Sequence, residues 1–347
     1  MIKSDEPFLS NYINSVGVKN GIPVSGTFEL TRRCNFRCAM CYVHSEENRE
    51  NELSADDWLK IACEARDRGM IFLLLTGGEP FLRDDFTQIY SSLAEMGFVI
   101  SVNTNGSLYR DGVRDLLLKY PPMRLNVSLY GLTDETCASL CGVRTCGTVA
   151  GSIRQMKTDG QRVRINYSPV TANVGEMELV AGFSRSIGVP VRFAPYVFPH
   201  TRNSMNDDAR LSPERAAEAA AKWRKINGFS VPEDDADDEC AIKGRNVVCR
   251  AGRSAFWITW DGRMLPCGTM NVEGFSLRNM PFSEAWERTV DFTGAVLLPE
   301  ECSECGMRGR CPVCASACLA ETGRFDGRPE YLCRMTGAAG GKGNNED

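Results

Sequence analysis

The sequence predicts an α/β fold in which a parallel sheet curves into a partial (β/α)6 TIM-like barrel, followed by a small cysteine-rich domain. Apolar, strand-like runs alternate with helical patterns through the first two thirds of the 347 residues. A strongly acidic stretch, residues 233–239, then precedes a change of composition. Beyond it lie nine of the sixteen cysteines, with frequent glycine and proline and little periodicity.

The first part of the chain has the rhythm of βα units joined by short connections. Ser54 is suited to cap the first predicted helix, because acidic residues follow it in the first turn. In such an order the strands are parallel, and functional residues are expected in the loops after them. The predicted strands are residues 24–30, 71–76, 99–103, 125–129, 162–170 and 189–193. The predicted helices are residues 54–68, 85–96, 110–119, 148–157, 176–186 and 213–225.

The composition predicts three segments. Residues 1–235 are expected to form the barrel with a short N-terminal lead-in, and residues 236–335 the cysteine-rich domain. Residues 336–347 are expected to be a flexible tail. The acidic stretch at 233–239 is expected to be a solvated linker between the first two segments.

Charge and hydropathy exclude several classes of protein. The net charge is −5 and no basic block stands out, so we expect no nucleic-acid partner. No signal peptide and no membrane-spanning run is present, which predicts a cytoplasmic protein with no membrane partner. In a reducing compartment, cysteines tend to be metal ligands or catalysts. His44 and His200 are the only histidines, so a histidine-rich zinc site or a Ser-His catalytic triad is not expected.

Three cysteines directly after the first predicted strand form a CxxxCxxC loop, made of Cys34, Cys38 and Cys41. Three such thiolates can each hold one iron of a [4Fe–4S] cube and leave the fourth iron open to a small molecule. A zinc site, or three unrelated buried thiols, are the alternatives that the spacing alone leaves open.

A second motif, Thr76-Gly-Gly-Glu-Pro80, follows the second strand and is expected at the same end of the sheet. Two residues without side chains there would let a ligand approach the backbone closely. Alone this motif is a weak signal, because turns with glycine and proline are common. Its place after the second strand strengthens the iron–sulfur interpretation of the cysteine loop.

With these two motifs, the first two thirds of the chain resemble the radical S-adenosylmethionine (SAM) superfamily. The resemblance implies that the open iron of a [4Fe–4S] cluster is chelated by SAM. It also implies reductive cleavage of SAM to a 5′-deoxyadenosyl radical that takes a hydrogen atom from a substrate. By this resemblance the cluster ligands are Cys34, Cys38 and Cys41, and the SAM pocket includes Met40, Tyr42, Gly77, Gly78, Glu79, Thr104, Asn105, Gly106, Ser128 and Asn173, with Arg144 on the SAM carboxylate.

The C-terminal cysteines are dense enough to indicate metal binding. Their run Cys302-x2-Cys305-x5-Cys311-x2-Cys314 taken alone also fits a zinc ribbon. After a radical SAM barrel it resembles the SPASM extension, which holds two auxiliary [4Fe–4S] clusters. The pattern departs at position 315, where an expected cysteine is Ala315.

By the SPASM resemblance, the C-terminal cysteines divide into two ligand sets. The first set is Cys249, Cys267 and Cys318, with Cys240 as its fourth member. The second set is Cys302, Cys305, Cys311 and Cys333. Cys314 then either has no cluster or takes the place of a neighbouring ligand.

The remaining cysteines are most simply small buried residues. Cys141 and Cys146 nevertheless follow the fourth strand on the active side, so either is a candidate donor of a hydrogen atom to a substrate radical. No general base can be chosen from the sequence.

The resemblance implies a maturase that modifies a ribosomally made peptide by a crosslink, an epimerisation or an oxidation. A small-molecule dehydrogenase on the same scaffold and a non-catalytic iron–sulfur electron carrier are the alternatives. About twenty residues precede the first strand, too few for a leader-binding domain, so a separate leader-binding protein is a possible partner. A flavodoxin- or ferredoxin-type reductant is the expected electron donor.

Overall fold

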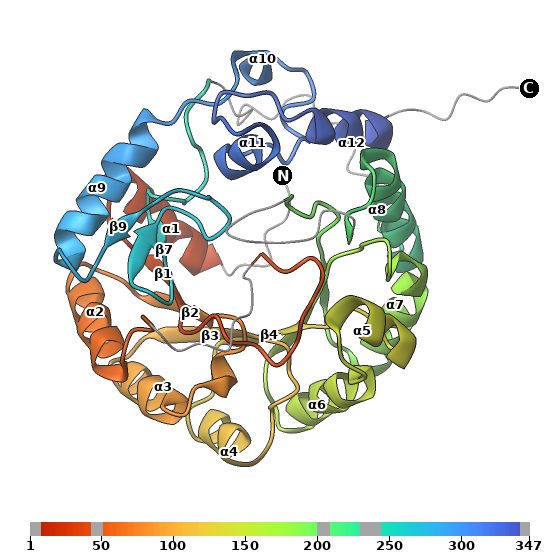
Figure 1. Ribbon diagram of the computed structural model, residues 1–347, viewed down its shortest axis with the longest axis horizontal. Coiled ribbons are helices and arrows are strands. Elements are labelled where there is room, and N and C mark those ends of the chain that lie inside the picture. Colours follow the sequence, from red (N-terminus) through yellow and green to blue (C-terminus); the bar gives the residue numbers. More distant parts are fainter. Residues whose placement is uncertain (1–7, 43–50, 200–208, 230–243, 341–347) are drawn as a thin grey trace, which may run out of the picture.

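The computed structural model describes residues 8–42, 51–199, 209–229 and 244–340 (Figure 1). The strands are β1 (Ser25–Glu29), β2 (Phe72–Thr76), β3 (Val99–Thr104), β4 (Arg124–Ser128), β5 (Val163–Tyr167), β6 (Val191–Phe193), β7 (Ala255–Ile258), β8 (Arg263–Leu265) and β9 (Phe275–Ser276). The helices are α1 (Phe8–Asn20), α2 (Ala55–Asp67), η1 (Pro80–Leu82), α3 (Phe86–Glu95), α4 (Asp111–Lys119), α5 (Asp134–Cys141), α6 (Cys146–Thr158), η2 (Val174–Glu176), α7 (Met177–Ile187), α8 (Pro213–Asn227), α9 (Phe282–Ala295), α10 (Glu300–Ser303), α11 (Ala315–Thr322) and α12 (Glu330–Gly340).

The predicted parallel barrel is confirmed. Its six strands pair in parallel as β1 to β6, in the spatial order β6-β5-β4-β3-β2-β1. Most of the helices, among them α2, α3, α4, α6, α7, α8 and α9, form a ring outside the curved sheet (Figure 1). Alternate side chains of the strands fill the space between sheet and helices, for example Phe28 and Leu75, which are fully buried. The carboxyl ends of the strands therefore meet on one face of the molecule.

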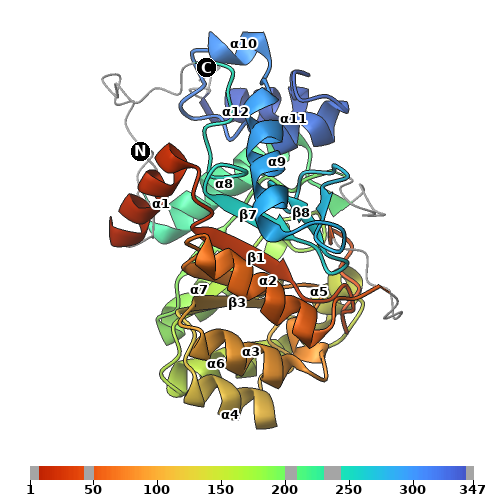
Figure 2. The same ribbon diagram turned by 90° about the vertical axis from the view of Figure 1, so that its left-hand side faces the viewer.

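The sheet continues beyond the six predicted strands. β7 pairs with β1 in parallel, with Ser25 opposite Ala255, and β8 and β9 extend this edge in antiparallel order. Strands from both sides of the predicted boundary near residue 236 therefore belong to one sheet, and Figure 2 shows β7 and β8 directly above β1. The three-segment division stays a prediction.

Helix caps explain where several helices begin. The predicted cap at Ser54 is present as a capping box, in which Ser54 and Asp57 exchange hydrogen bonds. α5 was not predicted, although Thr133 caps its first turn and Gly142 ends it in the left-handed conformation. α12 continues to Gly340, so residues 336–340 of the expected tail are helical. The acidic stretch 233–239 and residues 341–347 lie outside the described residues.

A polar cluster holds the C-terminal part of the chain against the barrel. The Arg210 guanidinium donates to the Glu321 carboxylate at 2.7 Å, and the Tyr196 hydroxyl donates to the same oxygen at 2.8 Å. The guanidinium also lies 4.1 Å from the ring centre of Tyr331. Arg210 and Glu321 are nearly buried, so the Coulomb attraction between their charges is stronger than in an exposed pair. None of the described helices is long and apolar enough to cross a membrane.

Candidate functional site: a cysteine-lined cavity at the carboxyl ends of the strands

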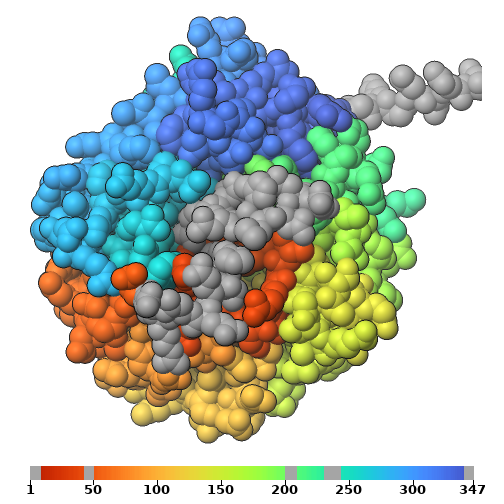
Figure 3. All heavy atoms as spheres, viewed as in Figure 1, coloured from red at the N-terminus to blue at the C-terminus, as the bar shows by residue number. Residues whose placement is uncertain are grey.

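A cavity of about 300 Å³ opens where the parallel strands end. In Figure 3 the orange-red atoms of the chain after β1 lie near the middle of this face, with the barrel elements around them. All three cysteines of the CxxxCxxC loop line this cavity. So do seven predicted SAM-pocket residues, namely Met40, Tyr42, Gly77, Gly78, Thr104, Asn105 and Ser128.

The glycine-rich turn after β2 packs against the cysteine loop itself. The Gly78 amide donates to the Thr31 carbonyl at 2.7 Å and the Glu79 amide to the Arg33 carbonyl at 2.8 Å, which extends the β1–β2 pairing beyond both strands. A Cβ atom on Gly77 would lie 2.4 Å from the Thr31 oxygen, and one on Gly78 would lie 2.3 Å from the Arg33 oxygen. The glycines are thus required by the chain's own close packing, a reason that the sequence analysis did not include.

Glu79 lies directly behind the cavity wall and joins it to β3. Its carboxylate accepts hydrogen bonds from the Thr104 hydroxyl at 2.8 Å and from the Asn105 amide at 2.7 Å. The side chain is fully buried, and burial raises the pKa of Glu79 to about 7. A carboxylate in this position can take a cationic partner, which would restore its ordinary acidity.

The three loop cysteines are held by neighbouring elements. The Cys34 sulfur accepts from the Phe36 amide at 3.3 Å and lies 3.8 Å from the Asn105 side-chain nitrogen. Burial raises the pKa of Cys34 to about 12. The pKa of Cys38 is also raised, mainly by its interaction with the Cys141 thiol and to a smaller extent by burial. Such thiols bind metal only with release of their protons. Their clustering around one cavity fits a metal–sulfur group.

Five predicted site residues do not line the cavity, namely Glu79, which lies behind its wall, Gly106, Arg144, Asn173 and Cys146. Arg144 is exposed and is not among the residues that line the cavity. Asn173 is buried outside the cavity, and its side chain accepts from the Val170 amide at 2.7 Å, so it shapes its own loop. Cys146 is bonded to Cys137, so its sulfur carries no hydrogen, and the prediction that it donates a hydrogen atom is wrong for this state.

A row of polar residues that the sequence analysis mostly missed crosses three strands of the cavity wall. Ser128 on β4 lies opposite Asn166 on β5, which in turn lies opposite Arg192 on β6, and all three line the cavity. Arg192 is the one cationic side chain among the described residues that line it. Only the register of the strands brings this row together, so sequence spacing gives no signal for it.

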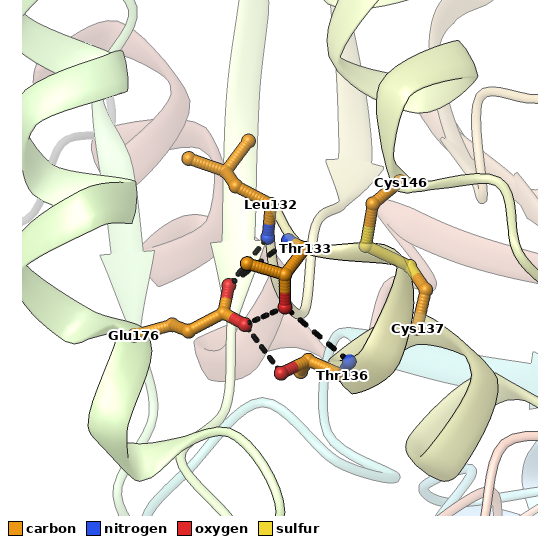
Figure 4. The surroundings of a disulfide bond; sticks show 6 residues. All are labelled: Leu132, Thr133, Thr136, Cys137, Cys146 and Glu176. Carbon is orange, nitrogen blue, oxygen red and sulfur yellow. Dashed lines mark hydrogen bonds between the residues drawn. A yellow bond between two sulfur atoms is a disulfide. The ribbon is translucent and has the colours of Figure 1, made fainter.

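The short helix α5 forms one side of the cavity and is fixed at its beginning and in its middle. Cys137 is bonded to Cys146 of α6, and the Glu176 carboxylate reaches the beginning of α5 (Figure 4). That carboxylate accepts from the Leu132 amide at 2.6 Å and from the hydroxyls of Thr133 and Thr136. These hydrogen bonds outweigh burial and lower the pKa of Glu176, which keeps it charged at a helix N-terminus.

In the C-terminal part, Cys249, Cys267 and Cys314 form one group. Burial, and to a smaller extent the nearby thiols of Cys267 and Cys249, raise the pKa of Cys314 to about 11. The pKa of Cys249 is likewise raised by burial and by Cys267. The thiol of Cys314, which the predicted division leaves over, therefore lies near those of Cys249 and Cys267.

A second group contains Cys302, Cys305, Cys311 and Cys333. Burial raises the pKa of Cys302, and each of the other three thiols raises it further. Cys318 is fully buried beside Cys302 and Cys314, between the two groups. Cys240 lies outside the described residues. Within the described part of the chain, no three Cys, His, Asp or Glu side chains converge closely enough, as placed, to hold a metal ion.

An open parallel barrel with three cysteines and a glycine-rich turn at one cavity is the arrangement expected of an enzyme that uses a bound iron–sulfur group. Residues 28–166, from β1 through β5, match the family model of the Radical SAM superfamily. This part of the chain is a radical SAM domain, as the motifs predicted.

Two curated relatives differ in what their names describe. The chain is 28% identical over 280 residues to the antilisterial bacteriocin subtilosin biosynthesis protein AlbA of Bacillus subtilis, over 77% of this chain and 59% of that protein. It is 24% identical to the AdoMet-dependent heme synthase of Methanosarcina barkeri, over 86% of this chain and 93% of that protein. The chain thus spans less than two thirds of AlbA.

Solved structures share the fold. Streptococcus suis SuiB bound to precursor peptide SuiA superposes with a TM-score of 0.70 at 16% identity, over 94% of this chain and 80% of that one. Native anSMEcpe with bound AdoMet gives a TM-score of 0.67 at 17% identity, over 91% and 96%. At these identities the likeness concerns the fold alone, and it extends beyond the barrel to the C-terminal part.

Proposed function

We propose that this radical SAM enzyme is a peptide maturase, which takes a hydrogen atom from a residue of a ribosomally made peptide. The observation that carries the proposal is the likeness to AlbA over 77% of the chain, which extends beyond the radical SAM segment. A fold shared with SuiB, a protein solved with a precursor peptide, supports it.

In this proposal Cys34, Cys38 and Cys41 hold a [4Fe–4S] cluster at the cavity. When bound there with SAM, the cluster supplies the electron for reductive cleavage of SAM. The chain's own residues position SAM. The buried Glu79 carboxylate lies behind the wall formed by Thr104 and Asn105 and, when charged, would attract the SAM amino group across that wall, while the cavity walls exclude water.

Arg192 replaces Arg144 as the proposed partner of the SAM carboxylate. It lines the cavity, whereas Arg144 does not, and it lies in one cross-strand row with Ser128 and Asn166. A guanidinium can bind a carboxylate through two parallel hydrogen bonds. Ser128 and Asn166 present a hydroxyl and an amide beside it, and both suit the hydroxyl groups of the SAM ribose.

We further propose two auxiliary [4Fe–4S] clusters in the C-terminal part. Cys249, Cys267 and Cys314 belong to the first, with Cys240 as its fourth ligand. The second has the group of Cys302, Cys305, Cys311 and Cys333. The chain would act in the cytoplasm with a flavodoxin- or ferredoxin-type reductant and a separate leader-binding protein.

Mass spectrometry tests the peptide proposal. The reconstituted enzyme is incubated without oxygen with SAM, a reductant and each short peptide encoded beside its gene. A mass change in one peptide, absent with Cys38→Ala enzyme, is the expected result. Cleavage of SAM with no peptide changed would favour a small-molecule substrate, the alternative supported by the likeness to the heme synthase over 86% of the chain.

A further inference from the structure

The last turn of α5 is hydrogen-bonded to the cysteine loop on both sides of Cys38. The Arg37 amide donates to the Cys141 carbonyl at 2.8 Å, and the Ala39 amide donates to the Leu140 carbonyl at 2.8 Å. The two carbonyls belong to the end of the helix, where no intrahelical donor remains for them. Cys38 is thereby fixed relative to α5 by the residues before and after it.

The side chains of Cys38 and Cys141 also meet. The two thiols interact closely enough that the pKa of Cys38 is raised and the pKa of Cys141 lowered, both residues line the cavity, and Cys141 is 2% exposed. A thiol can donate or accept, so a pair of thiols has two possible directions. Once Cys38 ligates iron its sulfur carries no proton, and Cys141 is then the only one of the two that can donate.

Two further contacts keep Cys141 in this place. The Cys137–Cys146 disulfide ties α5 to α6 one turn before Cys141, and the Glu176 carboxylate holds the beginning of α5 (Figure 4). A donor on a helix anchored at both ends costs little reorganisation when it meets a charged acceptor. The contact is therefore preorganised and does not depend on a mobile side chain.

We propose that Cys141 is a positioning residue for the cluster ligand Cys38, whose thiol donates a hydrogen bond to the Cys38 sulfur and raises the reduction potential of the cluster. Hydrogen bonds to cluster sulfurs are among the main determinants of the potential, because they stabilise the more negative, reduced state. The inference rests on the proposed binding of a cluster by Cys34, Cys38 and Cys41. It assigns Cys141 a role different from donating a hydrogen atom to the substrate.

A redox titration followed by electron paramagnetic resonance tests this role on the reconstituted holoenzyme. The signal to follow is the one that changes when SAM is added, since auxiliary clusters have no reason to respond. Cys141→Ala removes the donor, Cys141→Ser keeps a hydroxyl donor, and Cys63→Ala in α2 is the matched control. Cys141→Val, which also cannot donate, replaces the alanine variant if that variant does not fold.

The midpoint potential is expected to fall in Cys141→Ala and to return to or above the wild-type value in Cys141→Ser. Cys63→Ala is expected to match the wild type. An unchanged midpoint in Cys141→Ala, or the same downward shift in the alanine and serine variants, would overturn the inference. The absence of any SAM-responsive signal in the wild type would instead refute the proposed cluster itself.

Discussion

The two cysteine-rich regions of this protein are built in different ways. In the first, three cysteines lie within eight residues of one loop, directly after β1, and the fold needs only to bring a glycine-rich turn beside them. In the second, the cysteines lie between positions 240 and 333, from the residues before β7 to α12. A ligand set carried by one loop is visible in the sequence, whereas a dispersed set is decided by packing.

The largest expected difference is that the first region is needed for cleavage of SAM and the second only for modification of the peptide. Cys38→Ala should abolish both cleavage of SAM and modification of the peptide, because it removes a ligand of the cluster at the SAM cavity. The triple variant Cys302→Ala, Cys305→Ala, Cys311→Ala should still cleave SAM but no longer modify the peptide. Chromatographic quantification of 5′-deoxyadenosine beside peptide mass spectra measures both. Equal loss of SAM cleavage in the two variants would break the distinction.

Within the first region, the next largest expected effect is on the affinity for SAM, which should depend on Arg192 and not on Arg144. Loss of a charge-assisted hydrogen-bonded pair costs about 1.5–3 kcal/mol, or roughly 10- to 100-fold in affinity. Arg192→Gln should weaken SAM binding by that factor, and Arg144→Gln, the matched control, should leave it near wild type. Calorimetric titration with SAM and with decarboxylated SAM checks the assignment. Equal losses for both ligands in Arg192→Gln would show that the carboxylate is not its partner.

A smaller effect concerns the pH dependence of SAM binding. Because burial raises the pKa of Glu79 to about 7, this carboxyl is neutral below that pH and charged above it. Affinity for the SAM amino group should therefore rise with pH, about tenfold between pH 6 and pH 8. The dissociation constant measured across this range in wild type and Glu79→Gln checks it. A profile that stays equally steep in Glu79→Gln would assign the titration to another group.

The smallest expected effect sharpens the ligand sets of the second region. If Cys314 belongs with Cys249 and Cys267, Cys314→Ala should lose about four of about twelve irons, and Cys318→Ala should lose none. Iron analysis of both reconstituted variants, with SAM cleavage as a check on the first cluster, decides this. The reverse pattern would restore the division that the SPASM resemblance implies.

The same contrast explains what the sequence could and could not predict. The six parallel strands and the motifs after β1 and β2 were predictable, because hydrophobic runs and short spacings are local properties. α5 was missed although Thr133 and Gly142 mark its ends, because its eight residues give too little periodicity.

Contacts between distant residues had no local signal. The row ending at Arg192 depends on strand register, and the pairing of Cys137 with Cys146 depends on how α5 meets α6. Which of Cys314 and Cys318 lies near Cys249 and Cys267 depends on the turn of α11, which places the two cysteines in different surroundings.

The central claim is that the loop of Cys34, Cys38 and Cys41 holds a cluster whose open iron binds SAM. The most direct measurement is the electron paramagnetic resonance spectrum of the reduced, reconstituted protein before and after SAM is added. We expect SAM to change one cluster signal in the wild type and to have no effect in Cys38→Ala. A wild-type spectrum that does not respond to SAM, or a response that persists in Cys38→Ala, would contradict the claim.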